Sequence, residues 1–155
     1  MLNTTGAAPP ISEIDIQRFE QRRGMVLPMD YKRFLLLRNG GRPERDLFFV
    51  PESKMNLIAR IHFFFAMNDP RRWNNLDWAL DVVVDRIQKG FLPIATTEGS
   101  DDICLEIAGD HPGRILFWDK HIFKGENVYP VAKNFTEFIN GLFRDEDSPE
   151  VHAMS

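Results

Sequence analysis

Three short strand candidates follow one another between residues 91 and 121, with few residues between them. They are FLPIATT (91–97), DICLEIAG (102–109) and GRILFWDKH (113–121), and the turns EGSD and GDHPG connect them. Parallel neighbours need a crossover of a dozen or more residues, whereas a short turn can join antiparallel neighbours. The spacing therefore predicts an antiparallel meander in this half of the chain.

Two helices are predicted before the strands. Ser12 and Asp15 form a capping box at the start of the first helix, and Gly24 ends it. The segment LPMDYKRFLLLRNGG (27–41) predicts the second, because proline is well tolerated in the first turn of a helix and Asn-Gly-Gly ends one. The aromatic and leucine side chains of this segment recur at helical spacing and should share one buried face.

Two more helices and two more strands complete the pattern. Residues 74–90 predict an amphipathic helix that ends at a glycine, and residues 134–144 predict a closing helix. The aromatic segments 46–51 and 59–68 predict strands, and the second is apolar on both alternating faces, so the sheet should be covered on both sides there. The apolar stripe of the third helix comprises Leu76, Leu80, Val83, Val84 and Ile87.

The order of these elements predicts the fold class. Helices come first, then strands with one inserted helix, then a last helix. Such a chain is α+β, with a mainly antiparallel sheet flanked by N-terminal, inserted and C-terminal helices, and not an alternating α/β fold. With 155 residues it fits one domain over residues 11–144, between a flexible N-terminal tail (1–10) and a polar C-terminal tail (145–155).

Composition predicts a soluble cytoplasmic protein. A single cysteine, Cys104, excludes an internal disulfide and suits a reducing compartment. The first ten residues lack the basic and apolar regions of a signal peptide. No apolar run approaches the roughly 20 residues of a membrane span, so no membrane association is expected.

A search for chemistry finds no motif of a known catalytic or phosphate-binding class. Cys104 alternates with apolar neighbours in a strand candidate, which favours a buried small hydrophobe over a nucleophile. We therefore expect no catalytic residue, no metal and no cofactor. The histidines, which lack the spacing of a metal site, are His62, His111, His121 and His152.

Charge is unevenly distributed along the chain. Residues 1–75 hold 12 Lys/Arg and 8 Asp/Glu, a net charge of +4, and residues 76–155 hold 7 and 15, a net charge of −8; the two sum to −4. The acidic half argues against nucleic acid as a partner. It favours a basic protein partner, although a solvated face is the commoner explanation of a charge run.

Two sets of carboxylates are candidates for partner contacts. One set lies in and beside the meander, where two of its members could instead form a general acid–base pair or bind a cation. The other recurs every four residues on the third predicted helix and forms one acidic stripe, for which a solvated face is the alternative. The candidate contact residues are Glu98, Asp101, Asp102, Asp119, Asp77, Asp81 and Asp85.

Several blocks of this sequence resemble SUKH superfamily domains, the group that includes the Smi/Knr cell-wall assembly regulators. The first block is the helix segment at residues 27–43. Three further blocks, FLPIATTEGSDDICLEI, GRILFWDKH and VAKNFTEFINGLF, follow in the same order as in the family. The similarity spans about residues 14–143, whereas residues 52–89 match only in outline. The first block matches at Leu27, Pro28, Tyr31, Lys32, Phe34, Leu35, Asn39, Gly40, Gly41 and Pro43.

The resemblance implies an α+β domain that binds another protein, since the family has no shared catalytic residues. Many bacterial members look like immunity proteins, which neutralise a cognate toxin by direct association. We therefore expect an immunity protein with a toxin domain as its partner, and a basic nuclease is one candidate. The alternatives are a regulatory interaction module of the cell-wall regulator type and an enzyme that uses the loop carboxylates.

Overall fold

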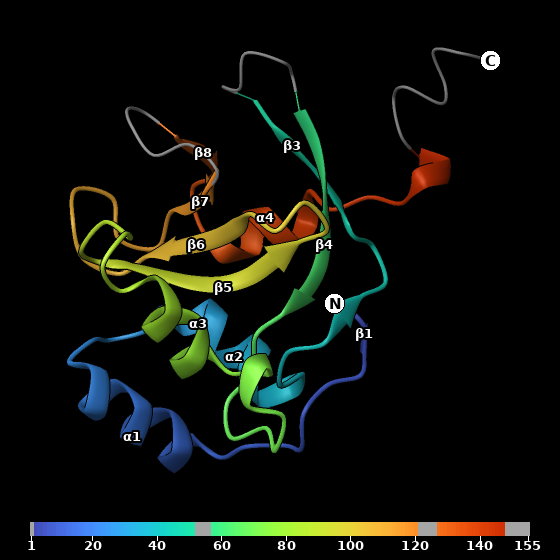
Figure 1. The fold of residues 1–155 in the computed structure, drawn as a ribbon. Coiled ribbons are helices and arrows are strands. Elements are labelled where there is room, and N and C mark those ends of the chain that lie inside the picture. The colour runs from blue at the N-terminus through green and yellow to red at the C-terminus, as the bar shows by residue number, and fades with distance from the viewer. Residues whose placement is uncertain (1, 52–56, 121–126, 148–155) are drawn as a thin grey trace.

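The computed structural model describes residues 2–51, 57–120 and 127–147 (Figure 1). Its main sheet has six strands, each antiparallel to the next, in the same order as in the sequence. This arrangement confirms the α+β class and the meander that the short turns predict. The strands are β3 (Leu47–Val50), β4 (Leu57–Phe64), β5 (Phe91–Thr97), β6 (Asp102–Glu106), β7 (Ile115–Trp118) and β8 (Val128–Ala132).

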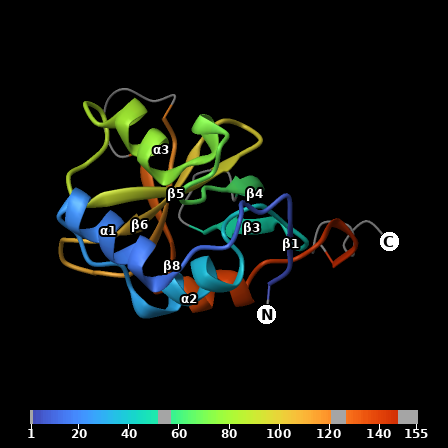
Figure 2. The ribbon, with the colours of Figure 1, turned by 90° about the horizontal axis from the view of Figure 1, so that it is seen from below.

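Helices cover both faces of this sheet. They are α1 (Glu13–Arg23), α2 (Met29–Leu37), α3 (Leu76–Val83) and α4 (Phe135–Asn140), with the 3-10 turns η1 (Arg72–Asn74) and η2 (Asp145–Asp147). In the view from below, α3 lies on the opposite side of β5 from α2 (Figure 2). Within the described ranges, none of these helices has the length and apolar character that crossing a bilayer requires.

Alternation along the central strands divides the core into two parts. Ile103 and Leu105 of β6 pack in a large cluster with α1, α2 and α4. Cys104, between them, faces a smaller cluster that includes Val83 of α3. β5, β6 and β7 are therefore covered on both sides. The double cover predicted for residues 59–68 is incomplete, because His62 and Phe63 of β4 are only half-buried.

The third helix is shorter than predicted. We expect a helix over 74–90, but α3 ends at Val83 and the chain continues in turns to Gly90. Three consecutive β-branched valines (82–84) lower helix propensity there. Val84, a predicted core residue, is 58% exposed, whereas Val83 is buried.

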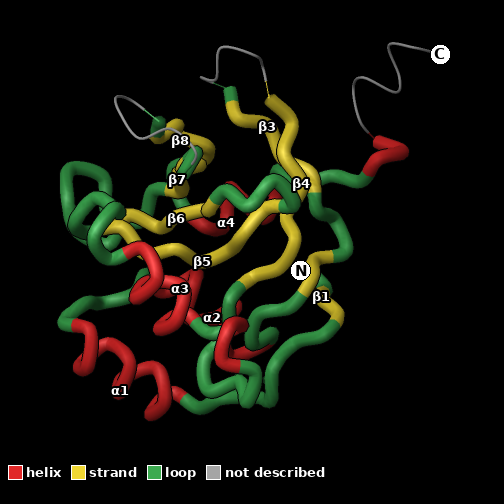
Figure 3. Tube along the Cα trace, viewed as in Figure 1, coloured by secondary structure: helices red, strands yellow, loops and turns green. Residues whose placement is uncertain are grey.

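The N-terminal segment is ordered, contrary to the flexible tail expected for residues 1–10. β1 (Thr4–Thr5) pairs with β2 (Arg42–Pro43) in a small second sheet (Figure 3). Leu2 is only 2% exposed and belongs to the large core cluster. The burial of this side chain outweighs the entropy that a free end would keep.

The C-terminal region also departs from the prediction. β8 was not predicted; its Pro130 suits an edge strand, where a missing N–H costs no ladder hydrogen bond. Asn134 caps α4, and the predicted closing helix ends at Asn140 rather than at residue 144. The expected polar tail begins with η2, and residues 148–155 lie outside the described residues, as does His121.

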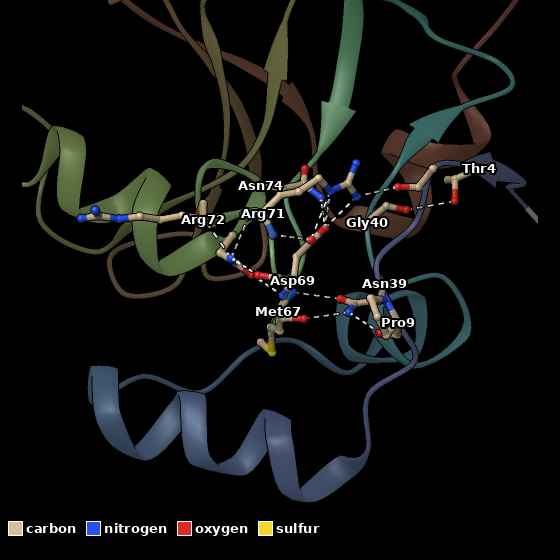
Figure 4. Close-up of polar contacts among 11 residues, drawn as sticks. Thr4, Pro9, Asn39, Gly40, Met67, Asp69, Arg71, Arg72 and Asn74 are labelled. Carbon is tan, nitrogen blue, oxygen red and sulfur yellow. Dashed lines mark hydrogen bonds and ion pairs between the residues drawn. The ribbon is translucent and has the colours of Figure 1, made fainter.

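The Asn-Gly-Gly sequence after α2 is a junction between distant segments. The Asn39 amide donates to the carbonyls of Pro9 and Met67 (2.8 Å each), and its oxygen accepts from the Met67 N–H at 2.9 Å (Figure 4). Gly40 has a left-handed φ of 78°, and a β-carbon there would lie 2.7 Å from the Phe64 carbonyl oxygen. Gly41 then exchanges two backbone hydrogen bonds with Phe64. Asn39 is 3% exposed, so these bonds replace water for buried backbone groups.

A buried carboxylate holds the adjacent loop. Asp69 accepts from Arg71 Nη2 at 2.7 Å and from Asn74 Nδ2 at 2.6 Å (Figure 4). Arg71 also donates to the Gly6 carbonyl at 3.2 Å, which ties the N-terminal segment to this loop. The hydrogen bonds from Arg71 and Asn74 outweigh partial burial and lower the pKa of Asp69 from 3.8 to about 2.

Gly40 and Gly24, two of the glycines with a left-handed φ, allow a matched test. Gly40→Ala should lower the free energy of unfolding by about 3 kcal/mol or more, because backbone strain and the clash with Phe64 add. Gly24→Ala has a similar φ of 64° with open space around it, and should cost only about 1 kcal/mol. Urea denaturation of both variants measures the difference; equal costs would contradict the close approach at Gly40.

Asp69 should make stability depend on pH. Because its folded pKa is about 2 and its ordinary value is 3.8, its contribution is present above pH 4 and is lost as pH falls toward 2. The free-energy difference between the wild type and Asp69→Asn should therefore be about 2 kcal/mol near neutral pH and narrow in acid. Denaturant unfolding at several pH values measures it. Asp110→Asn, at an exposed turn, is the control and should show no such narrowing.

Candidate partner-binding surface

The antiparallel order gathers one set of predicted acidic residues at one end of the sheet. The β5–β6 turn (residues 98–101) lies at the end where β7 finishes, since Asp102 pairs with Trp118. The β6–β7 turn (residues 107–114) lies at the opposite end. We call the carboxylates at the end of the sheet that carries the β5–β6 turn the acidic end; they are Glu98, Asp101, Asp102 and Asp119.

Asp102 is a structural member of the acidic end and not an exposed contact residue. It is 3% exposed and forms an ion pair with Lys120 (Oδ1 to Nζ, 3.2 Å). Burial raises the pKa of its carboxyl, and the positive charges of Lys120 and Arg86 offset only part of that effect. Its neighbour Asp101 is only half-buried.

Glu98 is the most accessible carboxylate of the acidic end. Its side chain is 60% exposed, and the nearest cation among the described residues, Arg60 Nε, lies 3.8 Å away. Arg60 makes closer ion pairs with Asp46 at 2.8 Å and Asp145 at 2.6 Å. Glu98 therefore keeps a charge that a partner can reach. Asp101 and Asp119 beside it are half-buried.

The second predicted set does not form a continuous acidic stripe. Asp77 lies 2.6 Å from both Arg22 and Arg23 at the end of α1, and Arg23 also reaches Asp81 at 2.9 Å. Partial burial would raise the pKa of Asp77, but the two arginines outweigh it and lower that pKa. These pairs join α3 to α1. Asp85 lies beyond the end of α3, exposed in the following turn.

Two carboxylates of β6 could form the catalytic pair that the sequence left open. Asp102 and Glu106 share a face of β6, but each is bound to its own cation. Glu106 accepts from Arg114 Nη2 at 2.8 Å and from the His111 N–H at 2.7 Å, which holds the β6–β7 turn. Within residues 2–51, 57–120 and 127–147, no group of three potential metal ligands occurs.

Cys104 fits the structural role that the sequence predicts. It is fully buried between the two neighbouring strands. Burial, together with the nearby Asp102 charge, raises the pKa of the Cys104 thiol well above its ordinary value. The side chain therefore remains a neutral thiol, which is a poor nucleophile.

An apolar hollow adjoins the acidic end and was not predicted. It has a volume of about 230 Å³ and lies between α3 and the sheet. Trp73 and Val82 on its rim are 49% and 58% exposed. Four separate parts of the chain form it, so a single sequence holds no local signal for it. We call it the α3 hollow; its lining includes Phe63, Trp73, Trp78, Val82, Asp102 and Lys120.

Comparison with known proteins identifies the family. The model of the SMI1 / KNR4 family (SUKH-1) matches residues 10–141, which include the six-stranded sheet and α1 to α4. A protein of Bacillus subtilis (strain 168), described as SPbeta prophage-derived uncharacterized protein YokK, is 27% identical over 143 residues, covering 82% of this chain and 72% of that protein. The chain described here belongs to the SMI1 / KNR4 family (SUKH-1).

Proposed function

We propose that this chain is a non-enzymatic immunity protein of the cytoplasm, which neutralises a cognate toxin domain by binding it directly. Family membership supports the proposal, because many bacterial SUKH domains look like immunity proteins. The printed description of one similar protein as prophage-derived also fits, since a toxin and its immunity protein must be inherited together.

One observation carries the proposal: an accessible carboxylate lies beside an apolar hollow with an exposed tryptophan. Glu98 and Asp101 lie in the β5–β6 turn, and Ser100 of the same turn lines the α3 hollow with Trp73. Protein interfaces typically combine a central aromatic anchor with a charged rim that steers association. The partner that fits has a basic surface around an apolar side chain, which suits a nuclease because it must bind phosphates.

Charge reversal tests whether toxin binding depends on the carboxylates of the acidic end or on the net negative charge of the whole chain. Glu98→Lys with Asp101→Lys should weaken binding to the toxin encoded next to this gene by about tenfold or more at low salt, mainly through a slower association rate. The loss should shrink at high ionic strength, where exposed charges are screened. Surface plasmon resonance and co-expression survival measure the two effects.

The matched control reverses one charge in the β6–β7 turn and one on α1, and leaves Glu106 intact. Asp110→Lys with Glu13→Lys changes the net charge equally at two exposed positions away from the acidic end, and should leave binding unchanged. If the wild-type chain neither binds nor suppresses the neighbouring toxin, the immunity function is wrong. Specific binding to a resident cell-wall assembly protein would then favour the regulatory alternative.

A further inference from the structure

A second hollow, distinct from the acidic end, carries charge of the opposite sign. It has a volume of about 320 Å³ and shares the rings of Phe63 and Trp73 with the α3 hollow. Every ionisable side chain that lines it is basic. We call it the basic hollow; the lining side chains used below are those of Arg42, His62, Phe63, Arg71 and Trp73.

Hydrogen bonds to neighbouring residues hold the Arg71 side chain in place. Its Nε and Nη2 atoms bond to the buried Asp69 carboxylate, and Nη2 also donates to the Gly6 carbonyl. Figure 4 shows the contacts between Arg71 and Asp69. Nη1 has no hydrogen-bond partner within the described part of the chain. A guanidinium fixed in this way can donate to a ligand with little further loss of entropy.

The negative charge of Asp69 balances the positive charge of Arg71. The net positive charge of the basic hollow therefore comes from Arg42. It is an exposed residue of β2, and its side chain makes neither an ion pair nor a hydrogen bond with the described residues. His62, half-buried on β4, is a further group that can hydrogen-bond a ligand. Three basic groups therefore meet from three different elements, and the lining includes no carboxylate.

Trp73 provides an aromatic wall in the same place. Its side chain is 49% exposed, and its ring centroid lies 5.6 Å from both the Phe63 ring and the Arg71 guanidinium carbon. These two contacts hold one part of the indole while the rest remains accessible. An exposed, fixed indole beside cationic groups can stack with a planar ring that carries negative charge.

We infer that the basic hollow binds a small ligand made of a planar ring with an attached phosphate or carboxylate. The anion lies on Arg42 and Arg71, which can form charge-assisted hydrogen bonds, and the ring lies on Trp73. The hollow has the size of a small-molecule site. The two proposals share Trp73, but ligand binding to the basic hollow can be measured without the toxin, whose proposed contacts also include the acidic end.

Four probes test the chemistry of this site. Adenosine 5′-monophosphate and indole-3-acetate carry a ring and an anion, adenosine carries only the ring, and inorganic phosphate is only an anion. Calorimetry should give saturable binding of at least one ring-bearing anion with a Kd below about 1 mM, and at least roughly tenfold weaker binding of adenosine and phosphate. The stronger of the two ring-bearing anions is the ligand used with the variants below.

Substitutions locate the binding. Arg42→Gln should weaken binding of that anion about tenfold without changing thermal stability, because it removes a charged donor that makes no internal contact. Trp73→Leu should also weaken it about tenfold. Arg18→Gln, on an exposed part of α1, removes the same charge elsewhere and should have no effect. Failure of both ring-bearing anions to saturate, or full affinity in Arg42→Gln, would overturn the inference.

Discussion

The Asn39 side chain joins three segments that are far apart in the sequence, and both candidate surfaces depend on this connection. Its amide binds the backbone at Pro9 and Met67, while Gly40 allows the chain to pass against β4. The loop that follows Met67 is then fixed by Asp69, and it leads directly into η1. Because η1 carries Trp73, the junction positions one of the two aromatic side chains that line both hollows, the other being Phe63.

This arrangement separates the residues that identify the family from those that we propose to bind ligands. The Asn-Gly-Gly sequence is buried and is fully used in backbone contacts. The accessible groups, such as Glu98, Arg42 and Trp73, lie outside this Asn-Gly-Gly sequence. They form no recognisable sequence motif. Members of such a family can therefore keep one fold while their surfaces change to suit different partners. The separation also explains why a search for catalytic motifs in the sequence finds nothing.

Local features were predictable from the sequence, whereas contacts between distant residues were not. The capping box of Ser12 and Asp15 and the left-handed Gly24 are confirmed, because a cap depends only on residues a few positions apart. The ion pairs of Asp77 and Asp81 with Arg22 and Arg23 were not predicted, since the arginines belong to another helix. In the same way, the pairing of Asp102 with Lys120 depends on the register of β6 and β7, which the sequence pattern left open. The antiparallel order of β5, β6 and β7 follows from turn length, but the small β1–β2 sheet depends on tertiary burial of Leu2.

Native-state hydrogen exchange of three backbone amides tests most directly whether the junction holds the rest of the structure. The N–H groups are those of Gly41, Phe64 and Met67, which bond across the junction. If the structure depends on these contacts, all three amides should exchange only through global unfolding. They should then be as strongly protected from exchange as the amides of the central strands. Exchange through local opening at much lower free energy, while β5 and β6 remain protected, would contradict that role.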